Sequence, residues 1–152
     1  VPLLLLTAAA PTTETPLNSE EKAKRIAATR GVTKHERDAH RIQTAKGVTL
    51  QWIDWNTRGS VNVQRGPVWF LRASQAEAGG PGRLFVSGRI VSISPDSFIL
   101  RGTIRITDTP DRGRHCEATK DWHFAITQNR PYYRLREFEW CDHLTDYIDI
   151  YF

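Results

Sequence analysis

The sequence lacks the short motifs that identify most catalytic and nucleotide-binding proteins. It contains no glycine-rich phosphate loop, no Gly-x-Ser-x-Gly nucleophile elbow, no zinc-protease motif and no carboxylate pair spaced for acid–base chemistry. These absences favour a non-enzymatic protein without a cofactor, although catalytic residues dispersed along the chain would leave no such signature.

Long hydrophobic runs are also missing. The most apolar stretch, residues 1–10, is far shorter than the roughly 20 residues that a membrane-spanning helix needs. We therefore expect no transmembrane segment. The four leucines of residues 1–10, followed by Ala8-Ala9-Ala10, are typical of the apolar region and the small-residue cleavage site of a secretory signal. We interpret residues 1–10 as the remnant of a signal peptide and predict an exported protein, periplasmic or extracellular.

Positive side chains outnumber negative ones only slightly. The net charge is +4, and residues 18–46 hold eight Lys/Arg against four Asp/Glu. A charge of this size produces only a weak long-range field at physiological salt, so we expect no nucleic-acid partner. The basic segment could still dock on another anionic partner or on a membrane surface, which is one alternative function for the chain.

The N-terminal third contains the only helical signals. Residues 11–17 include two prolines and three threonines and are interpreted as a flexible tether. Asn18 followed by Glu21, with Gly31 as a stop signal, predicts a first short helix. Thr33 followed by Glu36 repeats the capping spacing and predicts a second helix over residues 34–45. Residues 18–46 thus form a basic helical segment.

From residue 47 to residue 152 the hydrophobic period is two, which predicts a single antiparallel β domain. The first strand is expected from Val48 to about Trp55, with Val61 and Val63 as its hairpin partner. Further strands are expected at residues 67–73, 84–93, 98–106, 122–126, 132–140 and 147–152. The connections are too short for crossover helices, so the sequence predicts a meander that closes as a small barrel or packs as a sandwich. Gly88 and Gly102 mark places where the sheet can kink.

Cys116 and Cys141 are the only cysteines, and they flank one predicted strand pair. Because such a pair returns to its own base, the sulfurs can meet, and we predict a disulfide. The alternative is a hydrolase site at this hairpin base. Imidazole and carboxylate groups lie near this hairpin base in the sequence: His115, Asp121, His123, Asp142 and His143. Because their spacing is not that of metal ligands, we expect no metal.

Aromatic and arginine side chains form the best candidate site. Flat aromatic surfaces beside guanidinium donors can hold small molecules, envelope polymers or proteins. The predicted ligand-binding residues are Trp52, Trp55, Trp69, Tyr132, Tyr133, Arg134 and Arg136. The alternative is that these aromatics are core and cross-strand packing. Tyr132 and Tyr133 must face opposite sides of a strand. The leading hypothesis is an exported β-domain protein that binds through an aromatic and arginine-lined mouth or face.

Overall fold

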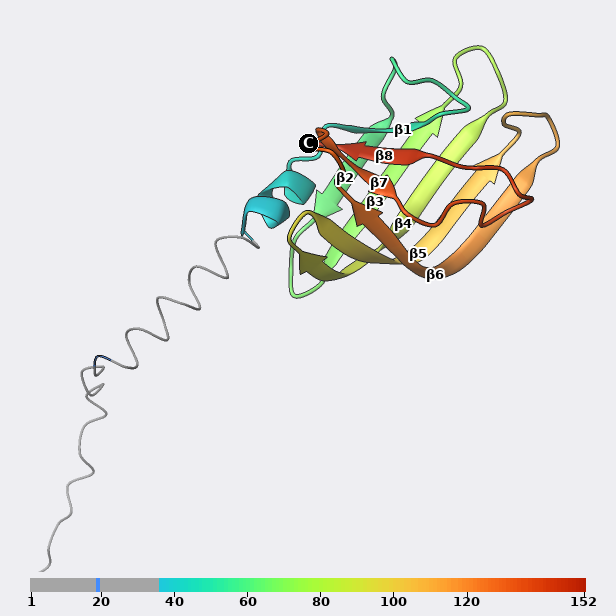
Figure 1. The fold of residues 1–152 in the computed structure, drawn as a ribbon. Coiled ribbons are helices and arrows are strands. Elements are labelled where there is room, and N and C mark those ends of the chain that lie inside the picture. Colours follow the sequence, from blue (N-terminus) through green and yellow to red (C-terminus); the bar gives the residue numbers. More distant parts are fainter. Residues whose placement is uncertain (1–18, 20–35) are drawn as a thin grey trace, which may run out of the picture. The chain divides into compact units, whose positions relative to one another are not determined.

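The computed structural model describes residue 19 and residues 36–152, and the barrel and the helix before it lie in one compact unit, Thr33–Phe152. Eight strands make up the fold (Figure 1). They are β1 (Gly47–Leu50), β2 (Ser60–Gln64), β3 (Trp69–Ala76), β4 (Arg83–Ser94), β5 (Ser97–Thr107), β6 (His115–Ala125), β7 (Tyr132–Leu135) and β8 (Ile148–Tyr151). Residues 1–18 and 20–35 lie outside the described part, and with them the predicted signal remnant, tether and first helix.

The strands form one antiparallel sheet that closes almost completely on itself. Its order is β1-β8-β7-β6-β5-β4-β3-β2, so β2 to β8 form a meander and β1 adds to the far edge. The two edges meet at a bridge in which the Gly59 amide donates to the Val48 carbonyl at 2.8 Å. The predicted antiparallel barrel is confirmed, and of the two expected closures the sheet takes the barrel (Figure 1).

Gln75 closes the rest of the gap between the edges. Its Oε1 accepts from the Leu50 amide at 2.7 Å, and its Nε2 donates to the carbonyls of Asp54 and Thr57 at 3.0 and 2.9 Å. An unpaired edge amide buried without a partner would be costly. The side chain therefore takes the place of a missing strand partner.

Several predicted strand boundaries are wrong. The strand predicted over residues 122–126 is too short, since β6 begins at His115. The first strand ends at Leu50 and not near Trp55, because the amides of Ile53 and Asp54 fold back onto the Leu50 carbonyl as a turn. Its partner is β8, whereas the segment with Val61 and Val63 pairs with β3.

The strand predicted over residues 132–140 is also too long, since β7 ends at Leu135. Beyond it the chain becomes irregular and Glu139 has a φ of 58°, which is incompatible with a continuous strand. The helix predicted over 34–45 ends earlier than expected, at residue 43, and its predicted start lies outside the described residues.

The barrel interior is packed with side chains. The predicted inward face of β5 is confirmed, because Phe98, Leu100, Ile104 and Ile106 are all buried. The Phe98 ring stacks on Phe124 with centroids 5.0 Å apart. The largest fully buried side chains are Trp122, Tyr133, Phe98, Phe124, Ile42, Leu50, Leu71, Leu84, Leu100, Ile104, Ile106 and Leu135. The interior is therefore a hydrophobic core.

Gly88 and Gly102 lie directly opposite each other on β4 and β5. A Cβ at Gly102 would stand 2.0 Å from the Ser87 carbonyl oxygen and 2.5 Å from the Gly88 Cα. The two backbones approach so closely that neither position has room for a side chain, which lets the long strands bend toward closure.

Substituting Gly102 should therefore destabilise the barrel. Gly102→Ala is expected to lower the free energy of unfolding by about 1–3 kcal/mol, as overpacking does. Gly66→Ala is the matched control, because the nearest atom to its new Cβ is 3.6 Å away. Urea denaturation of the two variants checks this, and equal midpoints would contradict it.

The helical turn at residues 36–43 packs against the barrel. Ile42 and Asp38 are fully buried. The Tyr133 hydroxyl donates to Asp38 Oδ1 at 2.6 Å, and the Asp96 amide donates to Asp38 Oδ2 at 3.2 Å. The helix is thus tied to β7 and to the β4–β5 turn. No helix within the described residues is both long and apolar enough to span a membrane.

Candidate functional site

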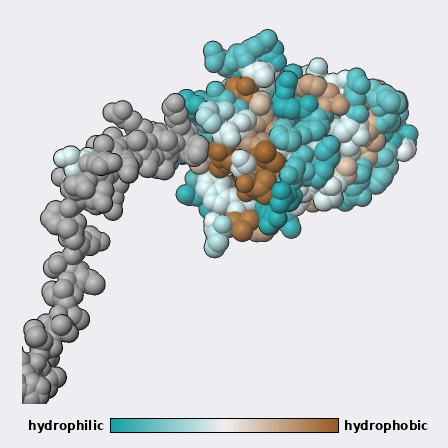
Figure 2. Space-filling view, turned by 60° about the horizontal axis from the view of Figure 1, so that its bottom comes forward, coloured by the Kyte–Doolittle hydropathy of each residue, from teal (hydrophilic) through white to brown (hydrophobic). Residues whose placement is uncertain are grey.

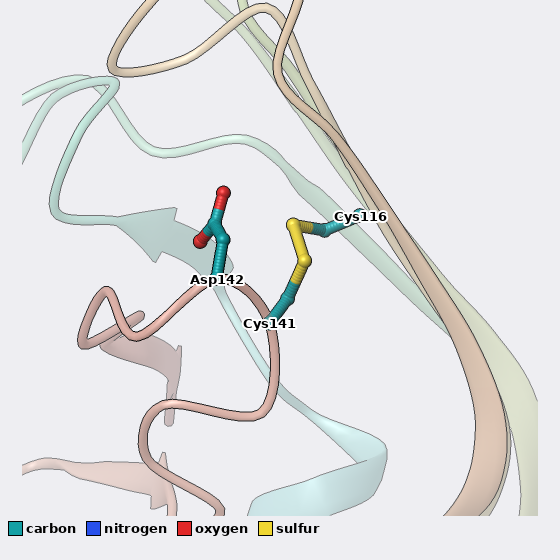
Figure 3. A group of neighbouring side chains, drawn as sticks. All are labelled: Cys116, Cys141 and Asp142. Carbon is teal, nitrogen blue, oxygen red and sulfur yellow. A yellow bond between two sulfur atoms is a disulfide. The ribbon is translucent and has the colours of Figure 1, made fainter.

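The predicted disulfide is present and links β6 to the β7–β8 connection. Cys116 and Cys141 are joined with their Cα atoms 6.0 Å apart. Cys116 is 1% exposed. Figure 3 shows that Asp142 follows Cys141 on the same loop. Because both sulfurs are oxidised, neither cysteine offers the thiolate that a nucleophile or a metal ligand requires.

Arg114 anchors the loop beyond the disulfide. Its guanidinium donates to both Asp146 oxygens at 2.8 and 2.9 Å and to Asp142 Oδ1 at 2.9 Å. The Arg114 side chain is 5% exposed and that of Asp146 is fully buried. Trp52 Nε1 donates to the same Asp146 at 2.9 Å. Hydrogen bonding to Arg114 lowers the pKa of Asp142. Trp52 is therefore engaged in a buried ionic network.

The histidines considered for a metal site do not gather around it. His115, His123 and His143 are all exposed, and His123 pairs with Glu137. Among the described residues, the one cluster of three possible ligand side chains is Cys116, Cys141 and Asp142, and two of these form the disulfide. The arrangement provides a structural clamp.

The candidate ligand residues on β7 divide between the two faces of the sheet, and Arg136 follows directly after the strand. Tyr133 points inward and is fully buried, while Tyr132 and Arg134 are partly exposed and Arg136 is exposed. Burial and the hydrogen bond to Asp38 both raise the pKa of Tyr133. Tyr133 is thus a core residue. Trp69 lies apart from the others, with the Arg65 guanidinium 5.1 Å from its ring.

The Tyr133 hydroxyl should contribute measurably to stability. Tyr133→Phe is expected to lower the free energy of unfolding by about 1.5–3 kcal/mol, because it removes a hydrogen bond to the buried Asp38 carboxylate. Thermal denaturation measures the loss. Tyr132→Phe is the control on the outer face, and an equal effect of the two substitutions would contradict the assignment.

Arg134 brings three of the seven candidate residues together. Its guanidinium lies 5.6 Å from the Trp55 ring, 5.1 Å from Tyr132 and 4.3 Å from Tyr147. It also binds Asp149 through two contacts of 2.7 and 2.8 Å. Burial raises the pKa of Asp149, against the opposing effect of Arg134. The cluster attaches the segment after β1 to the outside of the barrel. The guanidinium of Arg134 is already engaged by Asp149.

An outer-wall groove over β2 to β5 was not foreseen from the sequence. Its volume is about 710 Å³, and the residues that line it are Asn62, Gln64, Phe70, Arg72, Ser87, Gly88, Arg89 and Arg101. Phe70 is 52% exposed. Figure 2 shows hydrophobic residues gathered within a largely hydrophilic surface. The alternation in the sequence could have indicated that Phe70 and Arg72 share the outer face of a strand. That Arg89 and Arg101 lie beside them follows only from the pairing register of β3, β4 and β5.

The comparisons with known proteins identify the family of this chain. The PM1083 family model matches residues 17–152. The chain belongs to the PM1083 family. A relative described as "Uncharacterized protein PM1083", from Pasteurella multocida (strain Pm70), is 31% identical over 105 residues, which cover 68% of each chain. No solved structure matches. The PM1083 match includes the whole barrel, both cysteines and the groove.

Proposed function

We propose that this protein is an exported, non-enzymatic binding protein whose partner contacts the outer wall of the barrel. The observation that carries the proposal is the combination of a filled interior with an exposed aromatic and arginine-lined groove. Ligand sites are concave and combine apolar surface with a few polar groups. The wall over β2 to β5 has these features.

Export is supported by the disulfide. Disulfides persist in the periplasm and outside the cell and are rare in the cytosol. The Cys116–Cys141 bond joins two segments of the barrel domain, and the apolar N-terminal run is typical of a secretory signal. Fractionation of cells that express the protein should recover it in the periplasm or the medium with both thiols blocked to alkylation. Recovery of the reduced protein from the cytosol would contradict export.

A binding role is favoured over catalysis because the cysteines and the buried carboxylates are already bonded to other groups of the protein. Both cysteines are oxidised, and the buried carboxylates of Asp146 and Asp149 are held by Arg114 and Arg134. Groups that are fully paired in this way are stabilising elements of the fold. The exposed arginines of the groove remain as the polar groups available to a partner.

Hydrogen exchange tests where a partner binds. The purified protein would be measured alone and with an envelope extract of Pasteurella multocida, the source of the related protein. We expect slower exchange in β3, β4 and β5, the strands that carry most of the groove. Protection confined to the helix at 36–43 and its basic flank would instead favour docking through the N-terminal segment, and no protection would contradict binding to the extract.

A further inference from the structure

Two groove arginines face each other across neighbouring strands. Arg89 on β4 lies directly opposite Arg101 on β5. Residues paired in this way have Cβ atoms about 5 Å apart, and like charges in such pairs are destabilising. Arg72 on β3 pairs with Ser87, two residues before Arg89 and on the same face, so a third guanidinium lies on the adjacent diagonal.

The positive charge of the groove is only partly neutralised. Arg101 binds Asp121 through contacts of 2.7 and 3.1 Å. With the other described residues, Arg72 and Arg89 form neither an ion pair nor a side-chain hydrogen bond. No carboxylate occurs among the described residues that line the groove. The sheet thus holds three like charges together with one carboxylate beside them.

Exposed apolar side chains lie next to these charges. Phe70 on β3 lies directly opposite Arg89 on β4. Val91 is the extra residue at the point where the pairing register of β4 with β5 shifts. Val68, Phe70 and Val91 are 42%, 52% and 38% exposed. A ligand that covered them would gain from removing apolar surface from water. The groove therefore presents an anion-binding part and an apolar part side by side.

We propose that this groove binds an organic phosphate that has an apolar moiety next to its phosphate group. The inference rests on the proposed binding function and names its ligand class. Arginine donates in a planar fork that matches phosphate oxygens, and a phosphate monoester has about −1.5 to −2 charges and three acceptor oxygens. Three guanidinium groups therefore suit a phosphate ligand better than a carboxylate ligand, which has only one negative charge. Phe70 and its valine neighbours contact the apolar moiety.

The test compares phenyl phosphate with inorganic phosphate by NMR titration of the ¹⁵N-labelled protein. Phenyl phosphate should shift the amides of β3 to β5 and bind more tightly than inorganic phosphate. Arg89→Gln should weaken both at least about tenfold, as expected for the loss of a charge-assisted hydrogen bond. Phe70→Ala should remove the advantage of phenyl phosphate and leave inorganic phosphate unchanged. Arg112→Gln, at an exposed position in the loop between β5 and β6 and outside the groove, should alter neither.

A second measurement uses stability. In phosphate-free buffer Arg89→Gln should melt above the wild type, because it removes the repulsion between Arg89 and Arg101. Added phosphate should raise the melting temperature of the wild type more than that of the variant. Equal phosphate effects on the two proteins would overturn the assignment of Arg89.

Vesicles distinguish the source of the phosphate. Co-sedimentation with phosphatidylcholine vesicles that contain phosphatidic acid, but not with phosphatidylcholine alone, would support a lipid headgroup; binding of phenyl phosphate without vesicle binding would support a soluble ligand. Failure of both probes would overturn the phosphate inference. If envelope extract still protected β3 to β5 from exchange, the proposed function would stand with a different partner, such as an acidic protein.

Discussion

Replacing Arg114 by methionine should lower the free energy of unfolding by about 3–5 kcal/mol, which is the cost typical of leaving a buried charge without its partner. Asp146 is fully buried and takes two hydrogen bonds from Arg114, while Asp142 takes three more. Urea denaturation followed by tryptophan fluorescence measures the loss. The substitution keeps most of the side-chain volume, so the effect reports on charge.

Two comparisons separate the buried network from ordinary surface pairing. Arg101→Met removes an exposed ion pair with Asp121 and should change stability only slightly. The double variant Arg114→Met/Asp146→Leu removes both buried charges and should recover much of the loss. A small effect of Arg114→Met alone, comparable to that of Arg101→Met, would contradict the assignment of a buried ionic anchor.

Removing the disulfide should have a similarly large effect. Cys116→Ala/Cys141→Ala is expected to lower the free energy of unfolding by about 3–4 kcal/mol, because the bond closes a loop with a sequence separation of 25 residues. The loop contains most of β6 and all of β7, so its opening frees the chain on one side of the barrel. Denaturation of the oxidised wild type and the double variant provides the measurement.

Reduction gives an independent check on the same bond. The wild type in excess dithiothreitol should approach the stability of the double variant, whereas the variant itself should not respond to the reductant. If the reduced and oxidised wild types unfolded at the same denaturant concentration, the disulfide would not be the clamp described above.

Much of the fold could be predicted because its signals are local. The alternation of Phe98, Leu100 and Ile104 defines one face of a strand without knowledge of its neighbours. The cysteines lie near the outer ends of one strand pair, since Cys116 is at the start of β6 and Cys141 follows β7. The β1 pairing could not be predicted in the same way. Its partner β8 lies at the other end of the domain, and the local pattern instead favoured the nearby Val61 segment.

The candidate site was harder to predict because chemical type does not reveal what a side chain already binds. Arg134 lies beside Trp55 and Tyr132, and its charge is held by Asp149, 15 residues away in sequence. The sequence places Tyr132 and Tyr133 on opposite faces of a strand but does not show which of them lies in the core, and the structure shows that it is Tyr133. The groove arginines come from three strands, so only the register could show that they meet.

Photocrosslinking at two matched phenylalanines tests whether a partner contacts the outer wall over β2 to β5. Phe70 in the groove and Phe138 outside it are 52% and 40% exposed. Each would be replaced by a benzophenone amino acid, and the protein would be irradiated in cells and analysed by intact-protein mass spectrometry. The account predicts an adduct at position 70 that disappears with Arg89→Glu. An adduct at position 138 alone, or one at position 70 that is indifferent to Arg89→Glu, would contradict it.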